Sequence, residues 1–263
     1  MRGHRPSIPA RLGQHFLVNQ NVARRIVAEL GPVAGPVLEI GPGRGVLTSL
    51  LLEASPDREV VAVEKDPILC HQLEERFPER LRVLNRDIVE VSPETLFPAG
   101  TFHLIGNLPY LISKEIVDWL IVHRACIGSG VVMLQKDFVD KLLAKPGARR
   151  RNAQGVMFQL LFTASKILTV SPGSFSPPPR VDSTVIKFNL SPKWDRASPA
   201  LYEFLHGCFA SPRKTLANNL ATMHDRDTIQ TVLERVKLRA DSRAGDLTPE
   251  MFLSLFEAFQ QRK

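Results

Sequence analysis

The sequence predicts an α/β domain with a parallel sheet, followed by a small domain that is entirely helical. Short apolar segments alternate with amphipathic ones up to about residue 190, and only helical periodicity remains over 200–263. Alternation at this spacing is typical of βαβ units with right-handed crossovers. We therefore expect two domains, over residues 1–190 and 191–263, in a chain of 263 residues.

The first half of the large domain contains four predicted strands. Apolar residues at helical spacing predict a helix over 19–30, which Gly31-Pro32 ends. Short apolar runs predict strands at 37–40, 59–64, 81–84 and 102–106. Between and after these strands, helices are expected over 46–54, 67–77 and 113–123.

The second half of this domain closes the sheet. A fifth strand is expected at 130–135, followed by a helix over 136–144 and a polar, basic loop over 145–154. Two closing strands, 167–170 and 181–190, surround a proline-rich segment. Residues 191–199 are expected to form a linker to the helical domain.

The overall charge favours a polyanionic partner. The 34 Lys and Arg residues exceed the 27 Asp and Glu residues, which gives a net charge of +7 and favours phosphate contacts. The basic residues gather in three groups, each of which could also be a solvated face. They are Arg2, His4, Arg5 and Arg11; Lys141, Lys145, Arg149, Arg150 and Arg151; and Arg213 with Lys214.

Composition also excludes several classes of protein. No apolar run approaches the length of a membrane helix, and the N-terminus lacks the apolar core of a secretory signal. Cys70, Cys126 and Cys208 are scattered, as in a protein with reduced thiols, and no residues resemble a metal-ligand set. We expect a cytoplasmic monomer that needs neither a metal nor a membrane.

Three strand ends carry the pattern of a nucleoside-binding site. Gly41 and Gly43 follow the first strand and permit a tight turn with close ligand approach. Glu64 ends the second strand, where an acid accepts hydrogen bonds from ribose hydroxyls, and Asp87 follows the third, where it can accept from an adenine amino group. Each acid alone could be an exposed strand-end charge. The pyrophosphate fingerprint is incomplete, which suits a cofactor without pyrophosphate, and the glycine turn looks like one that closes over S-adenosylmethionine.

The segment Asn107-Leu108-Pro109-Tyr110 follows the fourth strand and predicts a clamp for an exocyclic amino group. The Asn107 side chain offers one acceptor, and Pro109 biases Leu108 to an extended backbone whose carbonyl offers a second. Tyr110 offers a ring on which an extruded base can stack. Without the upstream site, the same residues could simply form a turn.

Taken together, the chain resembles the ribosomal RNA adenine N6,N6-dimethyltransferases, especially the bacterial small-subunit enzymes, over its whole length. The motifs that carry the resemblance are Leu12-Gly13-Gln14-His15-Phe16-Leu17, the glycine turn, Glu64, Asp87, the Asn107–Tyr110 clamp and the segments 175–183 and 209–220. Two departures are His15, which is often Asn in the family, and the arginine-rich loop 145–154.

The resemblance implies a Rossmann-like methyltransferase domain with specific site residues. His15 and Leu17 would cover the methionine end of the cofactor, and Tyr110 and Phe175 would lie near the target base. The implied activity is dimethylation of two adjacent adenosines in the 3′ terminal hairpin of 16S rRNA, within an immature 30S particle. We expect Arg149, Arg150, Arg151, Arg213 and Lys214 to contact RNA phosphates.

Two other functions fit parts of the sequence. The 23S rRNA adenine methyltransferases that confer macrolide resistance share these motifs, although the segment 212–220 and the full small domain favour the small-subunit enzymes. A non-catalytic rRNA-binding assembly factor is the other alternative. The intact acids and clamp argue against it.

Overall fold

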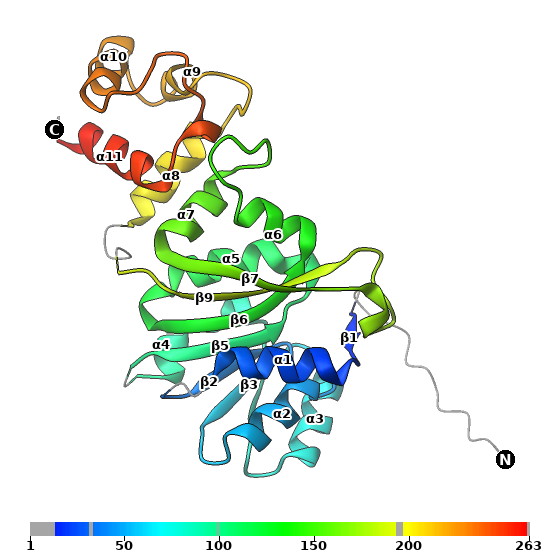
Figure 1. Ribbon diagram of the computed structural model, residues 1–263. Helices are drawn as coiled ribbons and strands as arrows, with labels where there is room; N and C mark the ends of the chain where they lie inside the picture. The colour runs from blue at the N-terminus through cyan, green and yellow to red at the C-terminus, as the bar shows by residue number, and fades with distance from the viewer. Residues whose placement is uncertain (1–13, 32–33, 99, 193–196, 262–263) are drawn as a thin grey trace. The chain divides into compact units, whose positions relative to one another are not determined.

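The computed structural model describes residues 14–31, 34–98, 100–192 and 197–261 (Figure 1). The expected basic group at Arg2, His4, Arg5 and Arg11 lies outside these residues, as do Leu12 and Gly13. A seven-stranded sheet has the order β4-β3-β2-β5-β6-β9-β7, and β1 pairs with β8 in a separate two-stranded sheet. The strands are β1 (Phe16–Leu17), β2 (Val37–Ile40), β3 (Val60–Glu64), β4 (Arg82–Asn85), β5 (Phe102–Asn107), β6 (Ile127–Gln135), β7 (Phe162–Val170), β8 (Phe175–Ser176) and β9 (Ser183–Leu190).

Helices fill the connections between the strands and make up the C-terminal region. Helix α1 contacts α2 and β5, and α3 contacts β3 and β4. The α-helices are α1 (Gln20–Leu30), α2 (Val46–Ala54), α3 (Pro67–Arg76), α4 (Pro93–Leu96), α5 (Ser113–Val122), α6 (Lys136–Leu142), α7 (Ala153–Leu161), α8 (Pro199–Cys208), α9 (Leu216–Leu220), α10 (Arg226–Arg235) and α11 (Pro249–Gln260). The α/β fold class with a helical C-terminal region is confirmed.

The sheet topology creates a ligand-binding edge at the end of β2. This strand pairs in parallel with β3 on one side and β5 on the other, and β3 pairs in parallel with β4. The carboxyl ends of these four strands therefore meet at one edge. After β2, the next two strands, β3 and β4, lie on one side of it, and β5 then lies on the other side. The strand order therefore reverses at β2, and open α/β sheets bind ligands at the carboxyl end of such a switch point.

Local sequence explains why these elements begin where they do. The Asn19 side chain caps α1 by accepting hydrogen bonds from two backbone N–H groups. Asp66 caps α3 by accepting from the Ile68 N–H, and Pro67 occupies the first turn of this helix. Every residue of β2 and β3 is buried, as expected for mostly apolar strands in a parallel sheet, and the buried residues include Glu39 and Glu64.

Contacts group the chain into two compact units that are discontinuous in sequence. The first contains residues up to Ile116, Gly130–Lys136 and Lys166–Lys187; the second contains Val117–Ser129, Asp137–Ser165 and the chain from Phe188 onward. Strands β6, β7 and β9 contribute to both units. The sequence boundary near residue 190 stays a prediction.

Some elements differ from the sequence expectation. Residues 153–154 begin helix α7 instead of ending a loop, and the side chain of Asn152 caps this helix by accepting from the Gly155 N–H at 2.8 Å. Nearly all of α7 is buried, so it lacks the amphipathic pattern that reveals a surface helix. The β1–β8 pair was missed because two-residue strands carry no periodic signal. Within the described residues, no helix is both long and apolar enough to cross a membrane.

Candidate active site

The glycine turn after β2 requires glycine for both conformation and space. Gly41 and Gly43 have φ angles of 65° and 56°, in the left-handed region. A Cβ on Gly43 would lie 2.9 Å from Cδ1 of Phe16, too close for a real contact. The Gly41 N–H donates to the Val63 carbonyl at 3.0 Å, which ties the turn to β3.

A cavity opens at this turn, at the predicted edge of the sheet. Its wall includes Phe16, Leu17, Glu39, Gly41, Gly43 and Asn107. Two acceptor atoms in the wall are buried and have no hydrogen-bond partner among the described residues: Oε1 of Glu39 and Oδ1 of Asn107. Buried acceptors without partners are costly unless a ligand satisfies them. The Glu39 carboxyl fits a cationic ligand such as S-adenosylmethionine, and Oδ1 of Asn107 fits an N–H group of a bound ligand.

Glu39 was not among the predicted site residues, although an acid inside the buried strand β2 was a visible signal. Its side chain is 1% exposed, and Oε2 accepts a hydrogen bond from the Thr48 hydroxyl at 2.7 Å. Burial raises the pKa of Glu39 to about 7. A cation bound beside it would favour its ionised form.

Glu64 fastens the glycine turn to the end of β3. Its Oε2 accepts from the Gly43 N–H at 3.2 Å, and its Oε1 accepts from the N–H groups of Lys65 and Asp66 at 2.9 and 3.0 Å. Burial raises the pKa of Glu64, and these backbone hydrogen bonds oppose that rise. The predicted ribose contact would use the acceptor capacity that these bonds leave.

Asp87 lies at the same edge, after β4. Its Oδ2 accepts from Nζ of Lys65 at 2.8 Å, and its Oδ1 accepts from the Val89 N–H at 3.3 Å. The hydrogen bond from Lys65 lowers the pKa of Asp87, so this carboxyl stays an acceptor. Sequence reasoning missed Lys65, which has no motif of its own.

The N-terminal motif orients the amide of Asn107. Its Nδ2 donates to the His15 carbonyl at 3.0 Å, so Oδ1 is the amide atom left without a partner. The His15 ring Nδ1 lies 2.9 Å from the Pro177 carbonyl. Leu17 lies in the cavity wall, and its expected contact with the methionine end of the cofactor stays a prediction.

The rest of the clamp is held by the neighbouring strands. The Leu108 N–H donates to the Met133 carbonyl of β6 at 3.0 Å, and Pro109 has an extended backbone before the 3₁₀ turn Tyr110–Ile112. The Tyr110 hydroxyl is hydrogen-bonded to the Ser183 hydroxyl. Burial raises the pKa of Tyr110, so the phenol stays protonated.

Phe175 is buried in the structure. Its side chain is 4% exposed and belongs to the apolar core, and its backbone pairs with Leu17 in the β1–β8 sheet. Its expected position near the target base stays a prediction. Its aromatic character is explained by packing.

The three arginines after Gly147 have different environments. Arg149 is exposed, and Arg150 lies 3.5 Å from the Asp137 carboxylate in an exposed ion pair. Arg151 is 5% exposed and donates to the Ala144 carbonyl. Because the Arg151 side chain is buried inside the loop, it cannot serve as the expected phosphate contact.

The second predicted RNA-binding group lies on a loop that Asn219 closes. Arg213 and Lys214 are exposed. The Asn219 side chain donates to the carbonyls of Cys208 and Ser211 and accepts from the Ser211 N–H. This explains why an asparagine in the 209–220 motif is buried.

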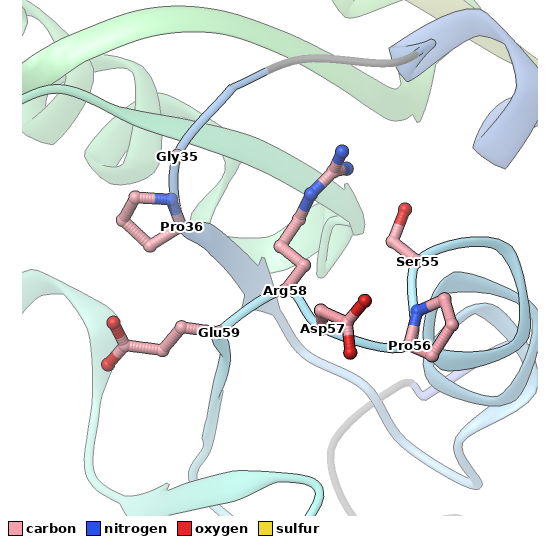
Figure 2. Close-up of a pocket in the computed structure, with 7 residues that line it drawn as sticks. All are labelled: Gly35, Pro36, Ser55, Pro56, Asp57, Arg58 and Glu59. Atoms are coloured by element: carbon pink, nitrogen blue, oxygen red, sulfur yellow. The ribbon is translucent and has the colours of Figure 1, made fainter.

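A second depression lies at the opposite edge of the sheet, before β2 and β3. Figure 2 shows its lining, which consists of Gly35, Pro36 and residues 55–59. Ligands of open α/β sheets bind at the carboxyl ends of strands. This depression is therefore not the active site.

Comparison with known proteins assigns the family. The model of the family "Ribosomal RNA adenine dimethylase" matches residues 7–261. The chain is 38% identical to "Ribosomal RNA small subunit methyltransferase A" of Acidobacterium capsulatum, over 98% of this chain and 92% of that one. A dimethyladenosine transferase from Plasmodium falciparum shares the fold, with a TM-score of 0.82, 24% identity and coverage of 94% and 98% of the two chains.

The 23S rRNA methyltransferase ErmE is also similar, with a TM-score of 0.70, 26% identity and coverage of 94% and 100%. The site geometry and these similarities agree on one chemistry. The chain belongs to the ribosomal RNA adenine dimethylase family, and it is a methyltransferase that uses S-adenosylmethionine.

Proposed function

We propose that this enzyme dimethylates N6 of two adjacent adenosines in the 3′ terminal hairpin of 16S rRNA, within an immature small subunit. The observation that carries the proposal is the buried, unpartnered Oδ1 of Asn107 in the cavity wall. Support for the small subunit comes from relatives named for it, at 33–38% identity. An immature small subunit as substrate would give the enzyme a role in subunit assembly. We also propose that it is a monomer and acts in the cytoplasm.

An adenine N6 is a weak nucleophile because its lone pair is delocalised into the ring. By accepting one N–H of that amino group, Asn107 Oδ1 would fix the amino group and concentrate its lone pair toward the methyl donor. The cofactor, when bound, supplies a methyl group on a sulfonium that is already a good leaving group. Glu39 and Glu64 would orient the cofactor from the cavity wall and the end of β3. Tyr110, whose hydroxyl is engaged by Ser183, would contribute its ring and not a proton transfer.

The test is primer extension across both rRNAs after incubation with enzyme and cofactor. The proposal expects a stop at two adjacent adenosines of 16S rRNA in immature small subunits. Asn107→Ala should abolish the stop while gel-shift affinity for RNA stays near that of the wild type, because phosphate contacts supply most of the affinity. Asn21→Ala, on the exposed face of α1, is the matched control.

Modification of 23S rRNA alone would contradict the proposal and favour the large-subunit alternative. That alternative is supported by the likeness to ErmE. If Asn107→Ala lowered RNA affinity and rate together, Asn107 would be a structural residue and not the clamp.

We also propose that exposed basic residues of the second unit hold the RNA backbone. We call them the basic surface: Arg149, Arg150, Arg213 and Lys214. Two backbone hydrogen bonds support it. The Gly147 N–H donates to the Gly245 carbonyl at 2.8 Å, and the Leu216 N–H donates to the Ser242 carbonyl at 2.7 Å. Both basic loops are thus attached to the segment 242–245.

Replacing Arg149 and Arg150 together by alanine should weaken RNA binding uniformly across sequences. It should also reduce the slope of log affinity against log salt by roughly one for each phosphate that the variant no longer neutralises, with cofactor affinity unchanged. The control replaces Arg24 and Arg25, two exposed arginines on α1, and removes the same charge. An unchanged slope in the loop variant, or an equal change in the control, would show that the basic surface does not contact RNA.

A further inference from the structure

Three sequence motifs far apart in the chain are linked by hydrogen bonds around the acceptor clamp. The His15 carbonyl accepts from Asn107, the His15 ring contacts the Pro177 carbonyl, and the Tyr110 hydroxyl meets the Ser183 hydroxyl. The rings of His15 and Tyr110 also lie 5.5 Å apart at 34°. The N-terminal motif and the proline-rich segment therefore both act on the clamp.

Within this network, we propose that Ser183 is a positioning residue that fixes the Tyr110 ring against the target base. The proposal rests on the proposed function of the clamp. The sequence gives no reason for a serine at this position beyond its place at the end of the 175–183 motif.

The two partners differ in how firmly the fold holds them. Ser183 is 0% exposed and begins β9, a strand that lies between β6 and β7 in the sheet. Tyr110 begins a 3₁₀ turn of three residues and is only partly buried. A turn this short fixes few dihedral angles by its own hydrogen bonds. The hydrogen bond between the two hydroxyls thus anchors the Tyr110 side chain, which lies on a turn, to a strand inside the sheet.

Backbone contacts already position the other end of the clamp. The Ser113 hydroxyl donates to the carbonyls of Pro109 and Tyr110, and the Leu108 N–H is bound to β6. These bonds hold the main chain and do not fix the side-chain torsions of Tyr110, whose ring lies beside the ring of His15. The bond to Ser183 is the hydrogen bond at the far end of the Tyr110 ring. Without it, the ring would sample several rotamers and the extruded base would lose its platform.

The test is a double-mutant cycle of Ser183→Ala and Tyr110→Phe, with kcat and KM for rRNA methylation measured separately. Each single variant should lower kcat about tenfold, because one buried hydrogen bond is removed. The double variant should be no slower than the slower single one, because both changes remove the same bond. Cofactor affinity by calorimetry and RNA affinity by gel shift should stay within about twofold of the wild type.

A fluorescent purine at the target position reports stacking directly. Its quenching by bound enzyme should decrease in Ser183→Ala and in Tyr110→Phe. The control is Ser174→Ala, which removes another buried serine hydroxyl, one bonded to Asn19 and not to the clamp. It should leave kcat and quenching unchanged.

Several outcomes would overturn the proposal. A Ser183→Ala enzyme with the wild-type kcat would refute it. A double variant whose loss of kcat equals the product of the two single losses would also refute it. If Ser183→Ala failed to fold, Tyr110→Phe, which keeps the serine and the ring, would decide: a wild-type kcat would refute the role of the bond. A wild-type enzyme that methylates no rRNA would instead refute the proposed function itself.

Discussion

Replacing Glu39 by glutamine should remove a specific part of the pH dependence of stability. The carboxyl lies inside β2 at 1% exposure, with Oε2 bonded to Thr48 and Oε1 without a partner among the described residues. Burial raises its pKa from 4.5 to about 7 in the folded protein. The folded state therefore holds a proton that the unfolded state has released between these values. The stabilising contribution is complete below pH 4.5 and is lost as pH rises through about 7.

The magnitude follows from the two pKa values. The gap between 4.5 and about 7 corresponds to about 3 kcal/mol, of which about 2.5 kcal/mol is lost between roughly pH 5 and pH 8.5. Glutamine does not titrate in this range. Relative to the wild type, Glu39→Gln should therefore gain about 2.5 kcal/mol of stability over the same interval.

Urea unfolding of the cofactor-free protein at both pH values measures this change. Comparing one variant with itself at two pH values cancels the pH-independent effect of placing an amide next to Thr48. Glu53→Gln, on the exposed part of α2, controls for the loss of one negative charge. If wild type and Glu39→Gln showed the same pH dependence, Glu39 would be hydrated or ionised at neutral pH, and the description of the cavity wall would be incorrect.

Two further variants test the predicted cofactor contacts. Glu64→Ala should weaken S-adenosylmethionine binding by about 1.5–3 kcal/mol, the range for hydrogen bonds to a charged group. The control Glu59→Ala should not weaken it. An unchanged affinity of Glu64→Ala by calorimetry would show that Glu64 does not contact the cofactor. Lys65→Ala should raise the pKa of Asp87, because Lys65 is the main cause of its lowering. Cofactor affinity should then begin to fall at a higher pH on acidification than in the wild type, and coincident pH profiles would show that Asp87 does not contact the cofactor.

The sequence could predict which residues lie at the binding edge because a parallel sheet brings strand ends together. Glu64, Asp87 and Asn107 each come at the end of an apolar run or just after it, and the observed parallel pairing of β4, β3, β2 and β5 brings the ends of these runs to one edge of the sheet. Their meeting required only the order of strands and helices. The same argument did not predict Glu39 as a site residue, because Glu39 lies one residue before the end of β2. The general pattern places ligand contacts at the last residue of a strand or after it, and Glu39 precedes the last residue of β2.

Tertiary packing decides what a motif residue does, and no local pattern carries that information. Phe175 and Tyr110 are both aromatic residues in clamp-related motifs, yet one is part of the core and the other is held at the site by Ser183. Each side chain owes its position to a strand far away in the sequence, β1 for Phe175 and β9 for Tyr110. Composition and spacing are the same whether such a partner exists or not.

The arginine-rich loop shows the same limit for charge. Arg149, Arg150 and Arg151 are consecutive and chemically identical, so the sequence alone does not distinguish them. In the folded loop, the chain reverses before α7, and the Ala148 carbonyl accepts from the Arg151 N–H at 3.1 Å. That turn directs the third guanidinium inward to the Ala144 carbonyl and leaves the first exposed. A buried cation that shapes the loop and an exposed one that can contact a phosphate thus differ only in backbone direction, and a charge count cannot distinguish them.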